Sequence, residues 1–138
     1  MKLLTLLMVV IATTNISFAQ SPIGKWKKVS HISTYDGQTF DSHKALLTQM
    51  PCADKIVHEI NADKTYRLNA SASSCDDKYK RIQEKLYSES VWTVSGNKIT
   101  IGHKNAPSIG QTYTFTTKGN TMIWTGTEGQ GVITWQKL

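Results

Sequence analysis

Short stretches of alternating apolar and polar residues, separated by turn residues, run through most of this chain. A period of two places successive side chains on opposite faces of a strand, so each stretch can bury one face. Short strands at regular spacing are typical of an all-β sandwich or barrel. We predict eight strands, at residues 25–33, 55–60, 66–70, 88–94, 98–103, 111–117, 121–126 and 132–137.

Each hairpin has one register that gathers its apolar side chains on a single face, because opposed residues on paired strands share a face. Consecutive hairpins of this kind predict an antiparallel up-and-down meander. Closure of the eight strands into a barrel would remove the exposed sheet edges, so we predict an eight-stranded barrel, with a two-sheet sandwich as the alternative. The preferred registers pair Ile60 with Tyr66, His58 with Leu68, Val94 with Ile99, Phe115 with Met122, Tyr113 with Trp124, and Trp124 with Ile133.

Two segments between the strands have helical character instead. Residues 41–50 open with Asp41, a capping residue, and stop at Pro51. Residues 76–86 are highly charged and carry three apolar residues at helical spacing, Tyr79, Ile82 and Leu86. The same segment has four basic residues, which form either a solvated helix face or a docking surface for an acidic partner: Lys78, Lys80, Arg81 and Lys85.

The beginning of the chain has the pattern of an export signal. Lys2 precedes an almost unbroken apolar run over residues 3–12, and the small-residue site Ser17-Phe18-Ala19 follows. The apolar run is shorter than the about 20 residues that a bilayer-spanning helix needs. We therefore predict a signal peptide at residues 1–19, no transmembrane segment, and a single domain at residues 20–138 in the periplasm or outside the cell.

Charge and cysteine content fit that compartment. The net charge of +6 is spread without a long basic run, which favours solubility over nucleic-acid binding. Cys52 and Cys75 are the two cysteines, and a pair in an exported domain predicts one disulfide, with free thiols as the alternative. The preferred hairpin register brings Cys52 opposite residue 74, so a disulfide at the base of that hairpin is geometrically reasonable.

A set of motifs gives the barrel a family resemblance. Gly24-Lys25-Trp26 resembles the Gly-x-Trp signature of lipocalins and other calycins, in which the Trp closes one end of the barrel under a basic side chain, here Lys137. The order of later motifs is similar to that of small lipocalin-like domains exported by Bacteroidetes-type bacteria. These motifs are Pro51-Cys52, Asn61-Ala62-Asp63-Lys64-Thr65-Tyr66, Cys75 and Val91-Trp92-Thr93-Val94. The resemblance implies a fold and little chemistry. Lys64 departs from it, since this position is usually Gly.

No motif in the sequence indicates catalysis. The four histidines lack metal-ligand spacing, and there is no nucleophile elbow or phosphate loop: His31, His43, His58 and His103. His58 is the one histidine on the apolar face of its strand, where a hydrogen-bonded core histidine is the main interpretation and a ligand contact the alternative. We therefore predict no enzyme activity, no metal and no cofactor.

The aromatic residues carry the functional hypothesis. Those assigned to the barrel interior are the candidate ligand-binding residues Trp26, Tyr66, Trp92, Tyr113, Phe115 and Trp124, together with Trp135. They either line a cavity for a small apolar ligand or fill the barrel, since eight strands enclose little more than their own side chains. Any cavity should be small and lie away from Trp26. We predict a monomeric binding module for a small apolar ligand. The alternative is a packed barrel that binds a protein partner through its loops, as an envelope accessory factor or inhibitor.

Overall fold

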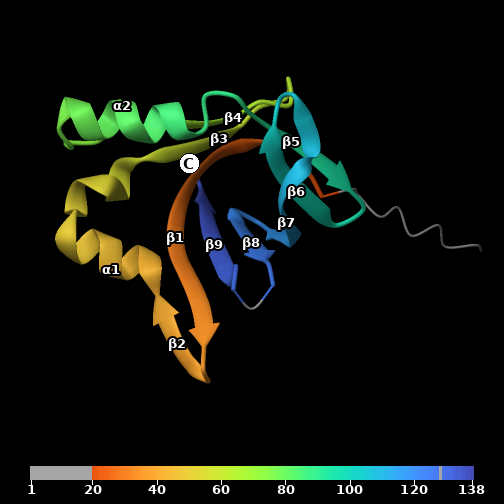
Figure 1. Ribbon diagram of the computed structural model, residues 1–138, viewed down its shortest axis with the longest axis horizontal. Helices are drawn as coiled ribbons and strands as arrows, with labels where there is room; N and C mark the ends of the chain where they lie inside the picture. The colour runs from red at the N-terminus through yellow and green to blue at the C-terminus, as the bar shows by residue number, and fades with distance from the viewer. Residues whose placement is uncertain (1–19, 128) are drawn as a thin grey trace, which may run out of the picture.

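The computed structural model describes residues 20–127 and 129–138, so the predicted signal peptide lies outside the described residues. Within the described residues the chain forms nine strands, two α-helices and one 3-10 helix (Figure 1). In chain order these are β1 (Gly24–Tyr35), β2 (Gln38–Asp41), α1 (Ser42–Gln49), η1 (Pro51–Lys55), β3 (Val57–Ile60), β4 (Tyr66–Asn69), α2 (Asp77–Leu86), β5 (Ser90–Ser95), β6 (Lys98–His103), β7 (Ala106–Lys118), β8 (Thr121–Thr125) and β9 (Val132–Lys137).

Eight of the strands form a nearly closed antiparallel barrel in the order β4-β3-β1-β9-β8-β7-β6-β5. The two end strands meet at one point, where Thr65 and Val91 form a β-bridge and the Trp92 backbone N–H donates to the Lys64 carbonyl at 2.9 Å. Arg67 supports this seam, because its guanidinium donates to the Ser90 carbonyl at 2.6 Å. The predicted up-and-down barrel is confirmed, and the sandwich is not formed.

The strand β2 and the helix η1 were not predicted. β2 pairs with β1 through a turn at Asp36 and Gly37, which both have positive φ, as the favoured two-residue hairpin turns require. The turn is visible in the sequence, but its return strand is exposed on both faces and therefore lacks an alternating pattern. The β1–β2 hairpin extends beyond the barrel (Figure 1).

The predicted register is wrong for the hairpin of β7 and β8. Phe115 pairs with Trp124, and Thr117 pairs with Met122, which is a shift by two residues. Gly119 has φ 58° and starts a two-residue turn, whereas the prediction placed the turn one residue earlier, at Lys118-Gly119. A shift by two leaves the same side chains on the same face, so the apolar pattern could not detect it. The other predicted registers in this set are confirmed: Ile60 with Tyr66, His58 with Leu68, Val94 with Ile99, and Trp124 with Ile133.

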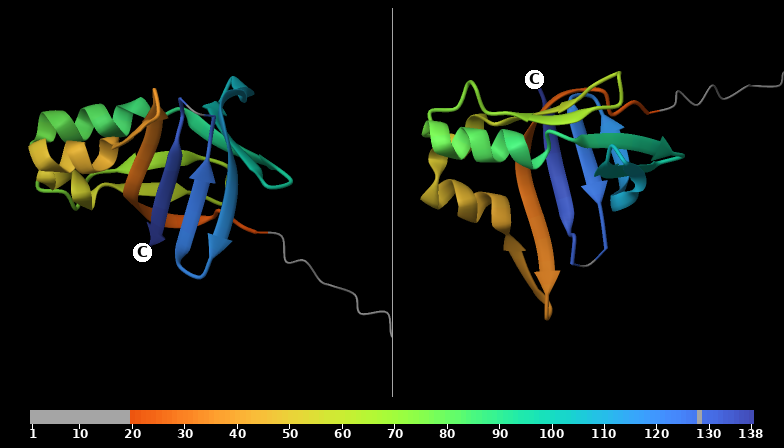
Figure 2. Two further views of the ribbon diagram at one scale, coloured as in Figure 1. Left: turned by 90° about the horizontal axis from the view of Figure 1, so that it is seen from below. Right: turned by 45° about the horizontal axis from the view of Figure 1, so that its top comes forward.

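Both predicted helices are present; Asp41 caps α1 as predicted, and Asp76 caps α2. The Asp41 carboxylate accepts hydrogen bonds from the backbone N–H groups of His43 and Lys44, and Asp76 accepts one from Tyr79. The helices lie on one side of the barrel (Figure 2). The predicted disulfide between Cys52 and Cys75 joins η1 to the segment just before α2, with the two Cα atoms 5.1 Å apart. It therefore ties together the two segments that lead into this helical layer.

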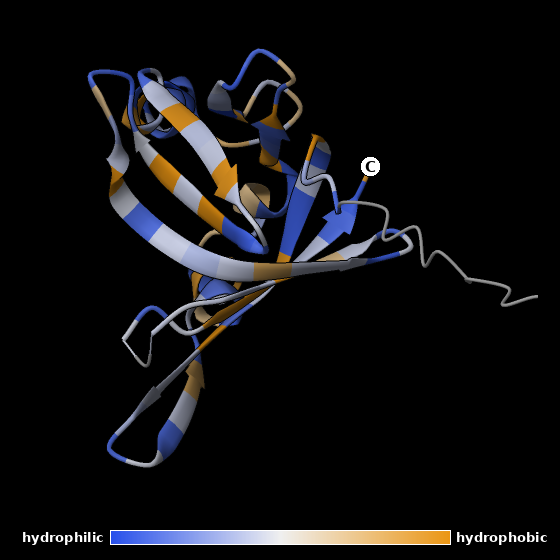
Figure 3. Cartoon of the chain, turned by 90° about the vertical axis from the view of Figure 1, so that its right-hand side faces the viewer, coloured by the Kyte–Doolittle hydropathy of each residue, from blue (hydrophilic) through white to orange (hydrophobic). Residues whose placement is uncertain are grey.

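The barrel core is built from alternate residues of the strands, whose alternating hydropathy is visible in Figure 3. At one end Trp26 is 2% exposed, and its indole N–H donates to the Pro22 carbonyl at 2.8 Å. The Lys137 ammonium lies over the Trp26 ring, 5.6 Å from its centroid, as the family resemblance implied. A Cβ at Gly24 would lie 3.1 Å from Lys137 Cε, so this approach favours glycine.

Candidate ligand-binding site

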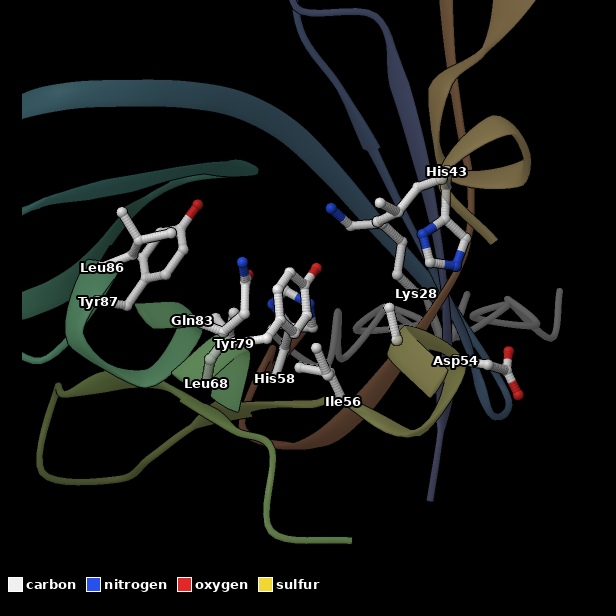
Figure 4. A pocket seen from close by; sticks show the side chains of 12 residues that line it. Lys28, His43, Asp54, Ile56, His58, Leu68, Tyr79, Gln83, Leu86 and Tyr87 are labelled. Carbon is white, nitrogen blue, oxygen red and sulfur yellow. The ribbon is translucent and has the colours of Figure 1, made fainter. Parts of the chain in front are cut away.

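A hollow site lies where the barrel meets the helical layer (Figure 4). Its outer part, about 140 Å³, lies between the sheet and the helices, and it is lined by residues that include His43, Ala53 and Tyr79. Its inner part, about 90 Å³, extends into the barrel. Lys28, His58 and Tyr87 line both parts, so the two hollows adjoin.

The structure divides the six predicted ligand-binding residues into two groups. All six are buried. Tyr66, Tyr113 and Trp124 line the inner hollow. Trp26, Trp92 and Phe115 line neither part of the site and instead pack the barrel core. The part of the barrel around Trp26, Trp92 and Phe115 is therefore filled by side chains, and the open space lies on the Lys28 side of Trp26.

Lys28 is the main residue of the site that sequence reasoning missed. It lies two positions after Trp26 on β1, and this parity places both side chains on the inner face of the strand. That parity was a usable signal. In Figure 4 the amino group of Lys28 points into the open space between His43 and Tyr87.

The Lys28 ammonium has no counter-ion in the part of the chain that the structure describes, where no carboxylate forms a salt bridge with it. Asp54, the carboxylate on the wall of the outer hollow, is bound to Lys27 at 2.7 Å. The Lys28 ammonium lies over the face of Trp135, with its nitrogen 5.3 Å from the ring centroid. Burial lowers the pKa of Lys28, which shows that water only partly solvates its charge.

His58 and Tyr66 form a neutral pair on the wall of the inner hollow. His58 Nδ1 and the Tyr66 hydroxyl oxygen lie 2.6 Å apart. Burial, followed by the charges of Lys28 and His43, holds the pKa of His58 well below its usual value. Burial, followed by Tyr87 and Tyr113, holds the pKa of Tyr66 well above its usual value. The neutral pair carries one N–H and one O–H hydrogen, and one of these two forms the hydrogen bond between the side chains. The other stays free to donate, from His58 Nε2 or from the Tyr66 hydroxyl, depending on the tautomer.

His43 adds a third basic group to the site. Its side chain is buried against the outer hollow, and its Nε2 atom has no hydrogen-bond partner among the described residues. Burial, followed by the charge of Lys28, lowers the pKa of His43, while Asp41 and Asp54 oppose this shift. Buried polar atoms are normally paired, so the unpaired Nε2 atom leaves the cost of burying it uncompensated.

Within residues 20–127 and 129–138, no group of three or more His, Cys, Asp or Glu residues is arranged to hold a metal ion. Over the same residues, no helix is both long enough and apolar enough to cross a membrane.

Comparison with known proteins identifies the family. A family model described as a lipocalin-like domain matches residues 23–124, and the chain therefore belongs to this lipocalin-like family. Neither the curated proteins nor the solved structures give a significant match. Eight-stranded barrels of the lipocalin kind are typically binding proteins that hold one small ligand inside the barrel. The family match and the barrel define a binding module.

The buried histidines should make stability depend on pH. Histidines in the unfolded chain protonate near pH ~6.5, whereas the pKa of His58 in the fold is much lower. Below about pH 6.5 the unfolded state therefore binds more protons, and stability present above this pH is lost as the pH falls. The expected loss in the free energy of unfolding is up to about 1.4 kcal/mol per pH unit for His58.

Urea titrations at several pH values between about 7.5 and 5 would measure this slope, in a range where carboxylates contribute little. His58→Gln should flatten it, since Gln keeps a hydrogen-bonding group near Tyr66 but does not titrate. Identical slopes for wild type and His58→Gln would contradict the prediction.

Proposed function

We propose that this protein is an exported, non-catalytic carrier or sensor that binds one small molecule between the barrel and its helical layer. The observation that carries the proposal is the hollow that extends into the barrel and shares Lys28, His58 and Tyr87 between its two parts. Buried polar groups are normally hydrogen-bonded within the protein, so polar groups on the wall of an open space favour a site that binds a ligand over a barrel that is only packed.

The size of the site limits the ligand. The two parts measure about 140 and 90 Å³. Drug-sized ligands occupy pockets of about 300–1,000 Å³, whereas about 150 Å³ is enough for benzene. The ligand should therefore have one ring or a short alkyl chain, and a long-chain fatty acid or a pigment should not fit without movement of the helices.

Export is part of the same proposal. Disulfides persist in oxidising compartments, and the bond between Cys52 and Cys75 fits such a location. Residues 1–19 have the pattern of a signal peptide, so residues 20–138 would form the mature domain in the periplasm or outside the cell.

Native mass spectrometry of the protein purified from its own host tests the proposal. We expect a retained molecule of about the size of a substituted benzene, released on denaturation. Ile101→Phe should prevent its retention, because Ile101 lines the inner hollow and the larger ring would fill it. Ile123→Phe is the matched control, since Ile123 lies on the outer side of β8 and is 38% exposed. A wild-type protein that retains nothing and also binds no small aromatic or aliphatic probe would contradict the proposal.

A protein-binding role is the second candidate, and the β1–β2 hairpin favours it. This hairpin extends beyond the barrel, and it exposes 86% of Tyr35 and 59% of Phe40 (Figure 1). Large exposed apolar residues that lie together are typical of interaction surfaces. If the hairpin binds a partner protein, that partner should co-purify with wild type. It should be absent from a Tyr35→Ser, Phe40→Ser double variant, which should still retain any bound small molecule.

A further inference from the structure

We propose that the ligand of this site is a small monocarboxylic acid, and that the Lys28 ammonium binds its carboxylate while its apolar part enters the inner hollow. This inference rests on the proposed binding function and adds the chemical class of the ligand. Three properties of the site support it: the positive charge that the site presents, the hydrogen-bond donor beside that charge, and the apolar space next to both.

The site presents one positive charge that nothing in the described chain neutralises. Lys28 comes from β1, and Asp54 from η1 is already paired with Lys27. The other titratable groups on the walls are histidine and tyrosine side chains, contributed by several elements: His31, His43, His58, Tyr66, Tyr79, Tyr87 and Tyr113. An unpaired ammonium in a partly dry cavity is costly, and a bound anion would remove that cost.

A hydrogen-bond donor is available beside this charge. The His58–Tyr66 pair always leaves one N–H or O–H hydrogen free to donate. A carboxylate has two oxygen atoms that accept several hydrogen bonds, so the ammonium can bind one oxygen while a neutral donor binds the other.

The apolar part of the ligand has a separate place. The inner hollow is lined by aromatic and aliphatic side chains, among them Ile101, Trp124, Ile133 and Trp135. Lys28 lines both hollows, so a carboxylate bound to it can direct a short chain into the inner hollow of about 90 Å³. A ring, for which about 150 Å³ is enough, would extend across both parts of the site. With a single unpaired cation, the site matches a monoanion better than a phosphate dianion.

Isothermal titration calorimetry with two matched pairs of probes tests the inference. Benzoate is compared with benzyl alcohol, and hexanoate with hexan-1-ol, at a pH of about 7.5, where the acids are ionised and the histidines neutral. We expect each acid to bind wild type about 10-fold or more tightly than its alcohol, because hydrogen bonds to charged groups are stronger than neutral ones. Inorganic phosphate should not bind.

Lys28→Met should abolish the preference for the acids and keep binding of the alcohols, since Met has a similar length and no charge. Lys25→Met is the matched control. It removes the same charge from an outer position of β1, where the side chain is 66% exposed, and should keep the full preference. Removal of the unpaired charge should also raise the melting temperature of the unliganded Lys28→Met protein, which shows that the variant is folded. Lys28→Gln provides a second uncharged variant if Met disturbs the strand.

The outcomes separate the inference from the proposed function. If acids and alcohols bind wild type equally, or if Lys28→Met keeps the preference, the inference is wrong and the binding function stands. Tighter binding of phosphate than of benzoate would also overturn the inference. If no probe binds wild type and the purified protein retains no molecule, both are wrong.

Discussion

Replacement of Trp26 by alanine is expected to lower the free energy of unfolding by about 3–5 kcal/mol. Trp26 is among the largest fully buried side chains, and it closes the barrel end below Lys137. The substitution removes the indole from the core and leaves a cavity that the surrounding strands cannot close. It also removes the hydrogen bond from the indole N–H to the Pro22 carbonyl. Urea denaturation followed by circular dichroism at neutral pH measures the change.

Two further variants make this prediction specific. Trp26→Phe keeps much of the buried apolar area and loses the hydrogen bond, so its cost should be clearly smaller than that of alanine. Tyr35→Ala, at a position that is 86% exposed, should change stability by no more than about 0.5 kcal/mol. If Trp26→Ala costs no more than Tyr35→Ala, the packing role of Trp26 is wrong.

The same variants test the ligand-binding role that the sequence suggested for Trp26. Its side chain lines neither part of the hollow site, so Trp26→Phe should leave the affinity for a bound probe unchanged. A substantial loss of affinity in folded Trp26→Phe would instead return Trp26 to the ligand site. The sequence could assign this residue to the interior, but it could not say whether the space beside it is filled.

The barrel could be predicted from the sequence because period-two patterns and turn residues both indicate strands and their pairing. Where the pattern is uninformative, prediction failed for a physical reason. The strand β2 is exposed on both faces, so no burial selects its side chains. The register of β7 with β8 moved by two residues because the glycine turn, and not the apolar pattern, sets the loop.

The candidate site could be predicted only in part, and the reasons lie in β1 and the helices. A β-bulge between Lys28 and Ser30 breaks the period of two, so that His31 lines the inner hollow where strict alternation would place it outside. His43 reaches the site through the placement of α1, which no local pattern specifies. Whether a space stays open depends on the sum of side-chain volumes and on how the helices pack. Short-range sequence patterns contain no information about either of these.

Loss of the disulfide is expected to lower the free energy of unfolding by about 3 kcal/mol, and the melting temperature by about 10 °C. The bond joins Cys52 to Cys75 across a sequence separation of 23, and the chain-entropy model assigns this cost to the extra freedom of the unfolded chain. Thermal melts of a Cys52→Ser, Cys75→Ser double variant and of wild type with a thiol reductant should agree with each other. A reduced wild type that melts at the temperature of the oxidised protein would contradict the prediction.

The position of this bond gives its loss a second effect, on binding. Cys52 lies in η1, whose Ala53 and Asp54 line the outer hollow, and Cys75 lies just before α2, which supplies Tyr79 to the opposite wall. Without the bond, no covalent link fixes η1 to the segment that leads into α2, so the outer hollow should lose its fixed shape. We expect the folded double variant to bind benzoate several-fold more weakly than wild type. Such a protein would bind its ligand best in an oxidising compartment, which connects the proposed export to the chemistry of the site.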